Sequence, residues 1–98
     1  MEEFTIQVMN FLRSIPKGKV VTYGYVAKAC GRPGSARQVA RILHSMSRKH
    51  NLPWHRVINA QGKISLTGTQ LDIQQALLES EGVEVSETKK IDLSRFHL

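Results

Sequence analysis

Acidic residues are missing from most of this 98-residue chain. The eight Asp and Glu residues all lie near the two ends, at Glu2 and Glu3 and then from Asp72 onward. The interval between Phe4 and Leu71 has no carboxylate side chain, yet it holds eleven of the 14 Lys and Arg residues. The formal net charge of +6 therefore understates a strongly basic surface, for which a polyanion is the natural partner.

Nucleic-acid binding is the favoured interpretation of the basic interval, and two alternatives stand beside it. An ordinary solvated surface is the simpler alternative, although so long an interval without a carboxylate is uncommon by chance. A membrane surface is a poorer partner, since no basic amphipathic helix in the sequence carries an exposed bulky apolar face.

The chain is also poor in cysteine and in long apolar runs. The single cysteine, Cys30, has no partner for an intramolecular disulfide, which favours a reducing, cytoplasmic setting. No stretch is long and apolar enough to predict a membrane span. A chain of this length fits one domain, residues 1–98, and we expect a monomer without cofactor or metal ion.

Three helical patterns occupy the first half of the chain. Apolar residues recur at helical spacing over residues 4–15 and predict a core-packing helix that Pro16 ends. Thr22 is a good N-cap for a second helix, which Gly31 can end at its C-terminus. A third amphipathic helix is predicted over residues 35–47, followed by a polar loop.

The third predicted helix has two distinct faces. Its apolar face consists of Val39, Ile42, Leu43 and Met46, and its other face of Arg37, Arg41, His44 and Arg48. Two short helices joined by about four residues including glycine, the second with an arginine face, form a helix-turn-helix pattern. An ordinary pair of amphipathic helices is the alternative.

The second half of the chain predicts a hairpin and a last helix. Val57 and Ile58, then residues 63–65, predict two short strands around a turn at Gly62. After a helix-turn-helix, such a hairpin is a wing. The fold class expected is therefore mainly α, a winged helix-turn-helix DNA-binding domain with a short β-hairpin wing.

The last helix is predicted at roughly residues 69–81, ended by Gly82. Its apolar side chains are expected to face the core: Leu71, Ile73, Ala76, Leu77 and Leu78. In the tail that follows, three apolar residues are expected to dock back on the domain: Ile91, Leu93 and Phe96.

A short polar and aromatic stretch lies between the third helix and the hairpin. It reads Pro53, Trp54, His55, Arg56, Val57. This stretch resembles the Pro-Cys-His-Arg-Val active-site signature of the O6-alkylguanine-DNA alkyltransferases, with tryptophan in the place of the cysteine. Further segments resemble the same family: residues 15–20, 22–24, 35–39 and 77–82. Tryptophan at this position, together with residues 64–68, resembles the alkyltransferase-like proteins, the non-catalytic branch.

The resemblance implies that this chain is not an enzyme. In the family a cysteine thiolate accepts the alkyl group, with a histidine and a glutamate helping to deprotonate the thiol. The indole of Trp54 is a hydrogen-bond donor only and does not ionise near neutral pH. His55 and Glu81 match the two helper positions. We expect them to hold residues 53–57, called here the motif loop, to the last helix by a hydrogen bond. Cys30 is expected to be an inert core thiol.

Roles in DNA recognition are also implied by the resemblance. Tyr23 would crowd the phosphate of the target nucleotide and promote its rotation, and Arg37 would fill the gap left in the base stack. Trp54 would meet the extruded base. The lesion pocket would also include Pro53, His55, Arg56 and Val57, and the DNA backbone would be contacted by Thr22, Ser35, Ala36 and Arg41. The alternatives are a core aromatic for Tyr23, a plain phosphate contact for Arg37 and a hydrophobic plug for Trp54.

Together these roles imply a function without catalysis. The expected partner is double-stranded DNA containing O6-alkylguanine, bound through the minor groove with base flipping, and the lesion would be marked for nucleotide excision repair proteins. One alternative is a winged-helix regulator that reads sequence through the major groove. Another is an alkyltransferase with a different nucleophile. Residues 66–69 depart from the family pattern, which leaves the range of accepted alkyl groups open.

Overall fold

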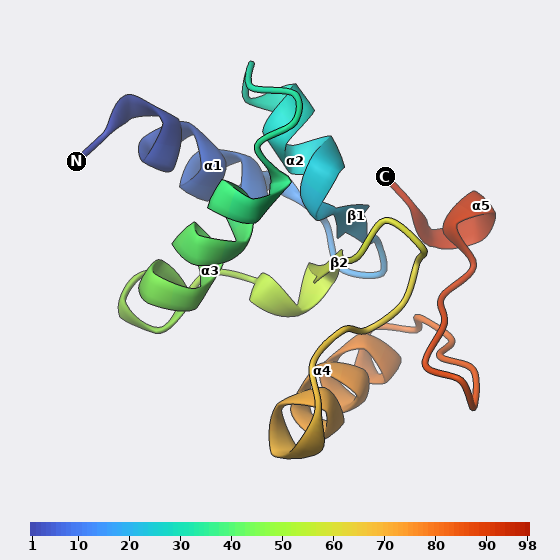
Figure 1. Cartoon of the computed structure of the whole chain (residues 1–98). Coiled ribbons are helices and arrows are strands. Elements are labelled where there is room, and N and C mark those ends of the chain that lie inside the picture. The colour runs from blue at the N-terminus through green and yellow to red at the C-terminus, as the bar shows by residue number, and fades with distance from the viewer.

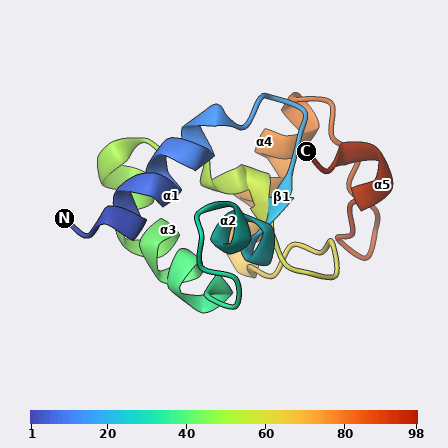
Figure 2. The same ribbon diagram turned by 90° about the horizontal axis from the view of Figure 1, so that it is seen from above.

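The computed structural model describes all 98 residues, and most of its regular structure is helical (Figure 1). The helices are α1 (Glu3–Ser14), α2 (Tyr23–Ala29), α3 (Ala36–His50), α4 (Gly68–Ser80) and α5 (Leu93–Phe96). The other elements are β1 (Val21–Thr22), the 3-10 turn η1 (Trp54–Arg56) and β2 (Val57–Ile58). In both views α1, α2 and α3 lie together on one side and α5 on the other (Figures 1 and 2). No helix is long and apolar enough to cross a membrane.

The first two helices begin and end as the sequence predicts. The apolar stripe of α1 is buried, with Val8 and Leu12 fully inaccessible. Thr22 caps α2, since its Oγ1 accepts a hydrogen bond from the backbone N–H of Tyr25 at 3.1 Å. Gly31 follows α2 at φ 84°, a left-handed conformation that glycine adopts without steric cost. The capping residues and the apolar spacing therefore predict where α1 and α2 begin and end.

Helix α3 is longer than its sequence pattern predicts. The stretch expected to be a polar loop after residue 47 continues as helix to His50 and ends at Asn51, whose φ is 51°. Asparagine tolerates this left-handed conformation better than most residues, so it can end a helix as glycine does. Arg48, Lys49 and His50 occupy the last turn, where positive charge interacts favourably with the helix dipole.

The predicted β-hairpin is wrong in its pairing. Strand β2 pairs in parallel with β1, with Val21 opposite Val57. Residues 63–64 pair with the tail instead, where the N–H of Ile64 donates to the carbonyl of Lys89 at 3.0 Å. The turn itself exists, because the N–H of Gly62 donates to the carbonyl of Asn59 at 3.0 Å. Val57 is fully buried, and pairing with β1 rather than with an exposed partner strand keeps it in the core.

Two hydrophobic clusters meet along the β1–β2 pair. The larger one has 13 buried residues and fills the space between α1, α2 and α3; it is called here the bundle core. The smaller one joins β2, α4 and the tail through Val20, Ile58, Ile64, Leu78, Val83, Ile91 and Phe96. The tail docks as expected, with Ile91 and Phe96 buried and the N–H of Leu98 bonded to the carbonyl of Val20 at 3.0 Å.

Helix α4 has the predicted length but not the predicted orientation. Leu78 is buried and Leu71 partly buried, whereas Ile73, Ala76 and Leu77 are exposed. Gln74 occupies the buried face, and its Nε2 donates to the carbonyl oxygens of His55 and Val57, each at 3.1 Å. These bonds satisfy buried backbone acceptors, which an apolar side chain could not do. The expectation that all five apolar residues face the core was therefore wrong.

Candidate nucleic-acid interface

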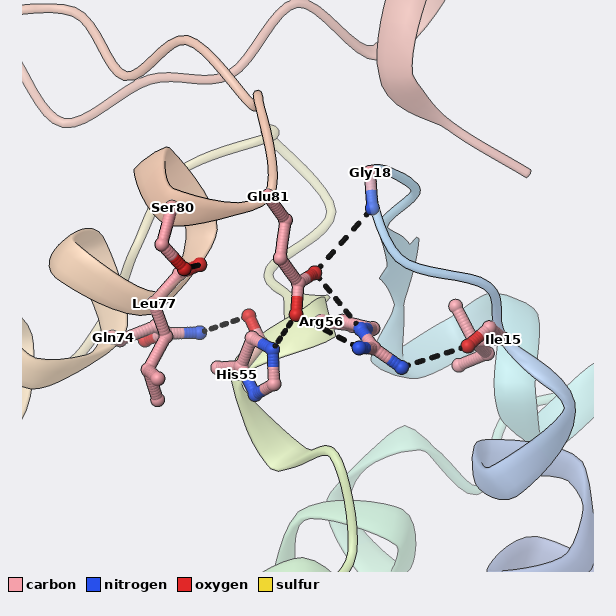
Figure 3. A network of polar contacts seen from close by, with 8 residues as sticks. All are labelled: Ile15, Gly18, His55, Arg56, Gln74, Leu77, Ser80 and Glu81. Carbon is pink, nitrogen blue, oxygen red and sulfur yellow. Dashed lines mark hydrogen bonds and ion pairs between the residues drawn. The ribbon is translucent and has the colours of Figure 1, made fainter.

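The motif loop is held by a carboxylate from the end of α4. Figure 3 shows Glu81 between the imidazole of His55 and the guanidinium of Arg56. Glu81 Oε2 lies 2.8 Å from His55 Nε2, and the predicted bond between these two side chains is confirmed. Arg56 adds a two-pronged contact, with Nε 3.0 Å from Oε1 and Nη2 2.8 Å from Oε2. A fork of this kind fixes orientation as well as distance.

The same cluster reaches the turn after α1. Arg56 Nη1 donates to the carbonyl of Ile15 at 2.8 Å, and the N–H of Gly18 donates to Glu81 Oε1 at 3.4 Å. The side chains of His55, Arg56 and Glu81 are only 10–12% exposed. We call this set of contacts the Glu81 clamp. It joins three segments that lie far apart in the sequence.

The clamp keeps its carboxylate ionised. The Arg56 guanidinium is the main cause that lowers the pKa of Glu81 from its usual 4.5 to about 2, while burial works in the opposite direction. The hydrogen bonds from His55 and from the Gly18 N–H lower this pKa further. A carboxylate that is charged and fully engaged is a structural anchor at neutral pH.

Pro53 and Trp54 are the members of the motif that the clamp leaves available. Val57 is fully buried in the bundle core, and His55 and Arg56 are committed to Glu81. Trp54 is half-buried against the bundle core, with its ring 6.3 Å from that of His55 at an interplanar angle of 87°. Its indole N–H bonds to no protein group. The indole ring of Trp54 therefore packs against the bundle core, while its N–H remains available to a ligand.

Tyr23 stands at the first position of α2 and is half-buried against the bundle core. Burial raises the pKa of its hydroxyl, and the nearby side chain of Ser65 partly offsets this rise. Tyr23 is therefore a neutral phenol near the loop that follows β2. The proximity of Ser65 to Tyr23 was not predicted, because the two residues lie 42 positions apart and belong to no common motif.

The start of α3 offers unpaired polar groups. Arg37 lies in its first turn, is exposed and makes no hydrogen bond or ion pair. Ser35 occupies the N-cap without a side-chain capping bond, and the first turn has no acidic residue. The unpaired N–H groups of a helix start and a nearby guanidinium are donors suited to phosphate oxygens. The small residue Ala36 and the exposed, unpaired Arg41 lie on the same helix.

Not every cation of the basic interval is free. Arg32, in the connection between α2 and α3, pairs with Glu2 at 2.9 Å and lies over the ring of Phe4 at 4.6 Å. The Oγ1 of Thr22, predicted to contact DNA, caps α2.

Cys30 follows the last residue of α2 and is half-buried. Burial raises the pKa of its thiol, so thiolate is scarce there. No group of three or more His, Cys, Asp or Glu side chains could hold a metal ion.

The sequence matches a known family and named proteins. Residues 3–83 match the family described as 6-O-methylguanine DNA methyltransferase, DNA binding domain. A protein of Vibrio parahaemolyticus named DNA base-flipping protein is 51% identical over 96 residues, which cover 98% of this chain and 96% of that protein. Alkyltransferase-like protein 1 of Schizosaccharomyces pombe is 41% identical over 90 residues, covering 90% and 83%. A methylated-DNA–protein-cysteine methyltransferase of Methanosarcina acetivorans is 40% identical over 80 residues, but the match spans only 51% of it.

Solved structures of similar proteins contain DNA. The structure of S. pombe Atl1 in complex with damaged DNA containing O6-carboxymethylguanine superposes with a TM-score of 0.90 at 38% identity, over 100% of this chain and 96% of that one. Mycobacterium tuberculosis OGT in complex with DNA gives a TM-score of 0.69 at 36% identity, over 84% of this chain and 50% of that one. The mainly helical fold with its two-stranded parallel sheet is thus shared over the whole chain with Atl1.

Proposed function

Since this chain belongs to the family of the 6-O-methylguanine DNA methyltransferase DNA-binding domain, we propose that it recognises O6-alkylguanine in double-stranded DNA and does not remove the alkyl group. The observation that carries this proposal is that Trp54 occupies the motif loop while the Glu81 clamp that holds this loop is intact. The loop that presents the family's acceptor residue is held rigidly, but an indole stands where a thiol would react. An indole cannot act as the alkyl acceptor at neutral pH.

A different nucleophile is a poor alternative within this chain. Cys30 is the single cysteine, and it ends α2 against the bundle core rather than in the motif loop. Burial raises the pKa of its thiol, which reduces the fraction of reactive thiolate. The chain therefore acts as a binding protein.

DNA binding is assigned to α2 and α3, used as a helix-turn-helix with α3 in the minor groove. Ser35 and Ala36 are small enough to approach the groove floor, and Arg37 and Arg41 are unpaired cations on the same helix. Because β2 pairs with β1, this proposal assigns no DNA contact to a β-hairpin wing. Phosphate contacts of this kind are independent of sequence and weaken as salt rises.

Base flipping is assigned to Tyr23 and Arg37, which stand at the starts of α2 and α3. Tyr23 stands at the start of α2 and would press on the phosphate of the target nucleotide, while Arg37 would occupy the vacated space. Flipping costs a few kcal/mol, and less for a poorly paired damaged base. Contact between Trp54 and the extruded base would recover about 1–3 kcal/mol.

The direct test compares a fluorescent duplex carrying one O6-methylguanine with the same duplex undamaged. Fluorescence anisotropy should give a lower Kd for the damaged duplex, and both Kd values should rise as salt is increased. Equal affinities at moderate salt would contradict lesion recognition. Preference for one undamaged sequence among random duplexes would instead favour a sequence-specific regulator.

A bound lesion that is not repaired needs a second step. We assign to this chain, acting as a monomer, the marking of the site for nucleotide excision repair proteins, as its resemblance to the alkyltransferase-like proteins implies. Retention supports this role, because a protein that keeps hold of the flipped base lengthens the time for which the site is marked.

A further inference from the structure

Helix α4 carries two apolar stripes, and only one of them is covered. Leu78 and the amide of Gln74 pack inward against β2 and the motif loop. On the other side Ile73 is 47% and Leu77 is 37% exposed, with Ala76 between them also exposed. These positions are related by i, i+3 and i+4, so they form one continuous face of the helix.

This uncovered face belongs to a helix that packs against the motif loop on its inner side but lies far from the connection between α2 and α3. In Figure 1, α4 is at the opposite end of the molecule from the connection between α2 and α3, and no other helix covers its outer side. Figure 2 agrees, since the α2–α3 connection faces the viewer and α4 lies behind it. A molecule bound at α4 would leave the start of α3 accessible.

The charge around α4 is opposite to that of α3. Residues 64–88 contain no Lys or Arg. Asp72 and Glu79 are exposed on α4 beside the apolar face and form no ion pair. Lys89 donates to the amide oxygen of Gln75 at 2.9 Å, and the Nε2 of Gln75 donates to Glu79 Oε2 at 3.4 Å, but Lys89 pairs with neither acid. The apolar face is thus bordered by two carboxylates that have no ion-pair partner.

This combination decides between three occupants. DNA is excluded by the carboxylates, which repel phosphates. A second copy of the chain, meeting α4 against α4, would bring Asp72 and Glu79 close to their own counterparts, an unfavourable like-charge contact. A protein segment with an apolar face and basic flanks is complementary both to the stripe and to its acidic border.

We propose that the outer face of α4, formed by Ile73, Ala76 and Leu77 with Asp72 and Glu79 at its edge, is a docking surface for a partner protein. The partner presents a short apolar helix flanked by Lys or Arg. The exposed apolar face is small, so the contact is weak and transient. This surface goes beyond lesion recognition and does not depend on it.

The test uses a synthetic amphipathic peptide of about four helical turns, with leucines on one face and lysines on its flanks. Titration into the isotope-labelled chain should shift NMR signals of α4 and leave those of α3 unchanged. A matched peptide with glutamate in place of each lysine should bind at least about tenfold more weakly. Shifts centred on α1 or α3, or equal binding of the two peptides, would overturn the proposal.

Variants separate docking from folding and from DNA binding. The double substitution Ile73→Gln and Leu77→Gln should weaken the lysine peptide about tenfold or more while leaving the Kd for damaged DNA unchanged. Ile6→Gln, at a 42% exposed isoleucine of α1, is the matched control and should have no effect on peptide binding. Undiminished peptide binding by the double variant would contradict the assignment. Light scattering that shows a dimer of the parent chain and a monomer of the double variant would also contradict the assignment.

Discussion

The polar side chains of the motif loop are paired within the protein, whereas those at the start of α3 are unpaired. In the motif loop, the donors of Arg56 and the carboxylate of Glu81 are paired inside the protein, with side chains only 10–12% exposed. At the start of α3, Arg37 has no partner and Ser35 makes no capping bond. The comparison separates scaffolding from binding, because paired groups hold the loop in place and unpaired groups remain for a ligand.

Removing Glu81 should have the largest effect on the scaffolding side. Glu81→Ala leaves the guanidinium of Arg56 nearly buried without its counter-charge, and we expect a loss of about 3 kcal/mol in the free energy of unfolding. Urea denaturation measures this loss. The matched control is Glu84→Ala, because the Glu84–Arg95 pair is 61–68% exposed and should contribute no more than about 1 kcal/mol. Equal losses in the two variants would remove the distinction between clamp and surface pair.

Lowering the pH should reduce the free energy of unfolding by an amount similar to that lost in Glu81→Ala. The pKa of Glu81 is lowered from 4.5 to about 2, so its ionised form stabilises the fold above about pH 4.5. This stabilisation of about 2–3 kcal/mol is lost as the pH falls from 4.5 through 2. Urea denaturation at a series of pH values should show a decline that is much smaller in Glu81→Gln. A variant with the same decline as the parent would show that other groups cause it.

On the binding side, Arg37→Ala should weaken binding of the damaged duplex by about 1–3 kcal/mol and leave the free energy of unfolding within about 0.5 kcal/mol of the parent. Arg37 is exposed and unpaired, so its loss costs no internal contact. Anisotropy and urea denaturation give the two values. Arg48→Ala, an exposed arginine in the last turn of α3, is the control and should cost less lesion affinity. If both variants bound equally well, the start of α3 would have no special role.

The smallest expected change is in activity after Trp54→Cys. The Glu81 clamp would persist, but a site shaped around an indole should hold the smaller thiol too loosely for in-line attack. Incubation with DNA carrying labelled O6-methylguanine should therefore leave little or no label on the variant. Efficient labelling would mean that the loop alone still supports transfer, and that Trp54 is the whole difference between binding and repair.

Local patterns predicted the elements better than their partners. The bounds of α1 and α4 and the Thr22 cap follow from periodicity and capping chemistry within one segment. The pairing of β2 with β1 instead of residues 63–65 depends on burial across the whole domain, which a short strand pattern does not encode. Apolar content alone assigned all five apolar residues of α4 to the core and did not show that Ile73, Ala76 and Leu77 would be exposed.

The polar contacts divide in the same way. The His55–Glu81 bond could be predicted because both residues match positions in a known motif. The fork from Arg56 to Glu81 was not predicted, because the resemblance placed Arg56 in the lesion pocket rather than beside Glu81. Gln74 left a weak signal, since an amide within an apolar helical face requires polar partners when it is buried.

Native mass spectrometry tests recognition without transfer most directly. The chain is mixed with equal amounts of a duplex carrying one O6-methylguanine and its undamaged counterpart, and the complexes and the released protein are weighed. Recognition without transfer predicts a dominant complex with the damaged duplex, and a released protein of unchanged mass. Equal occupancy of the two duplexes, or a protein heavier by one methyl group, would contradict it.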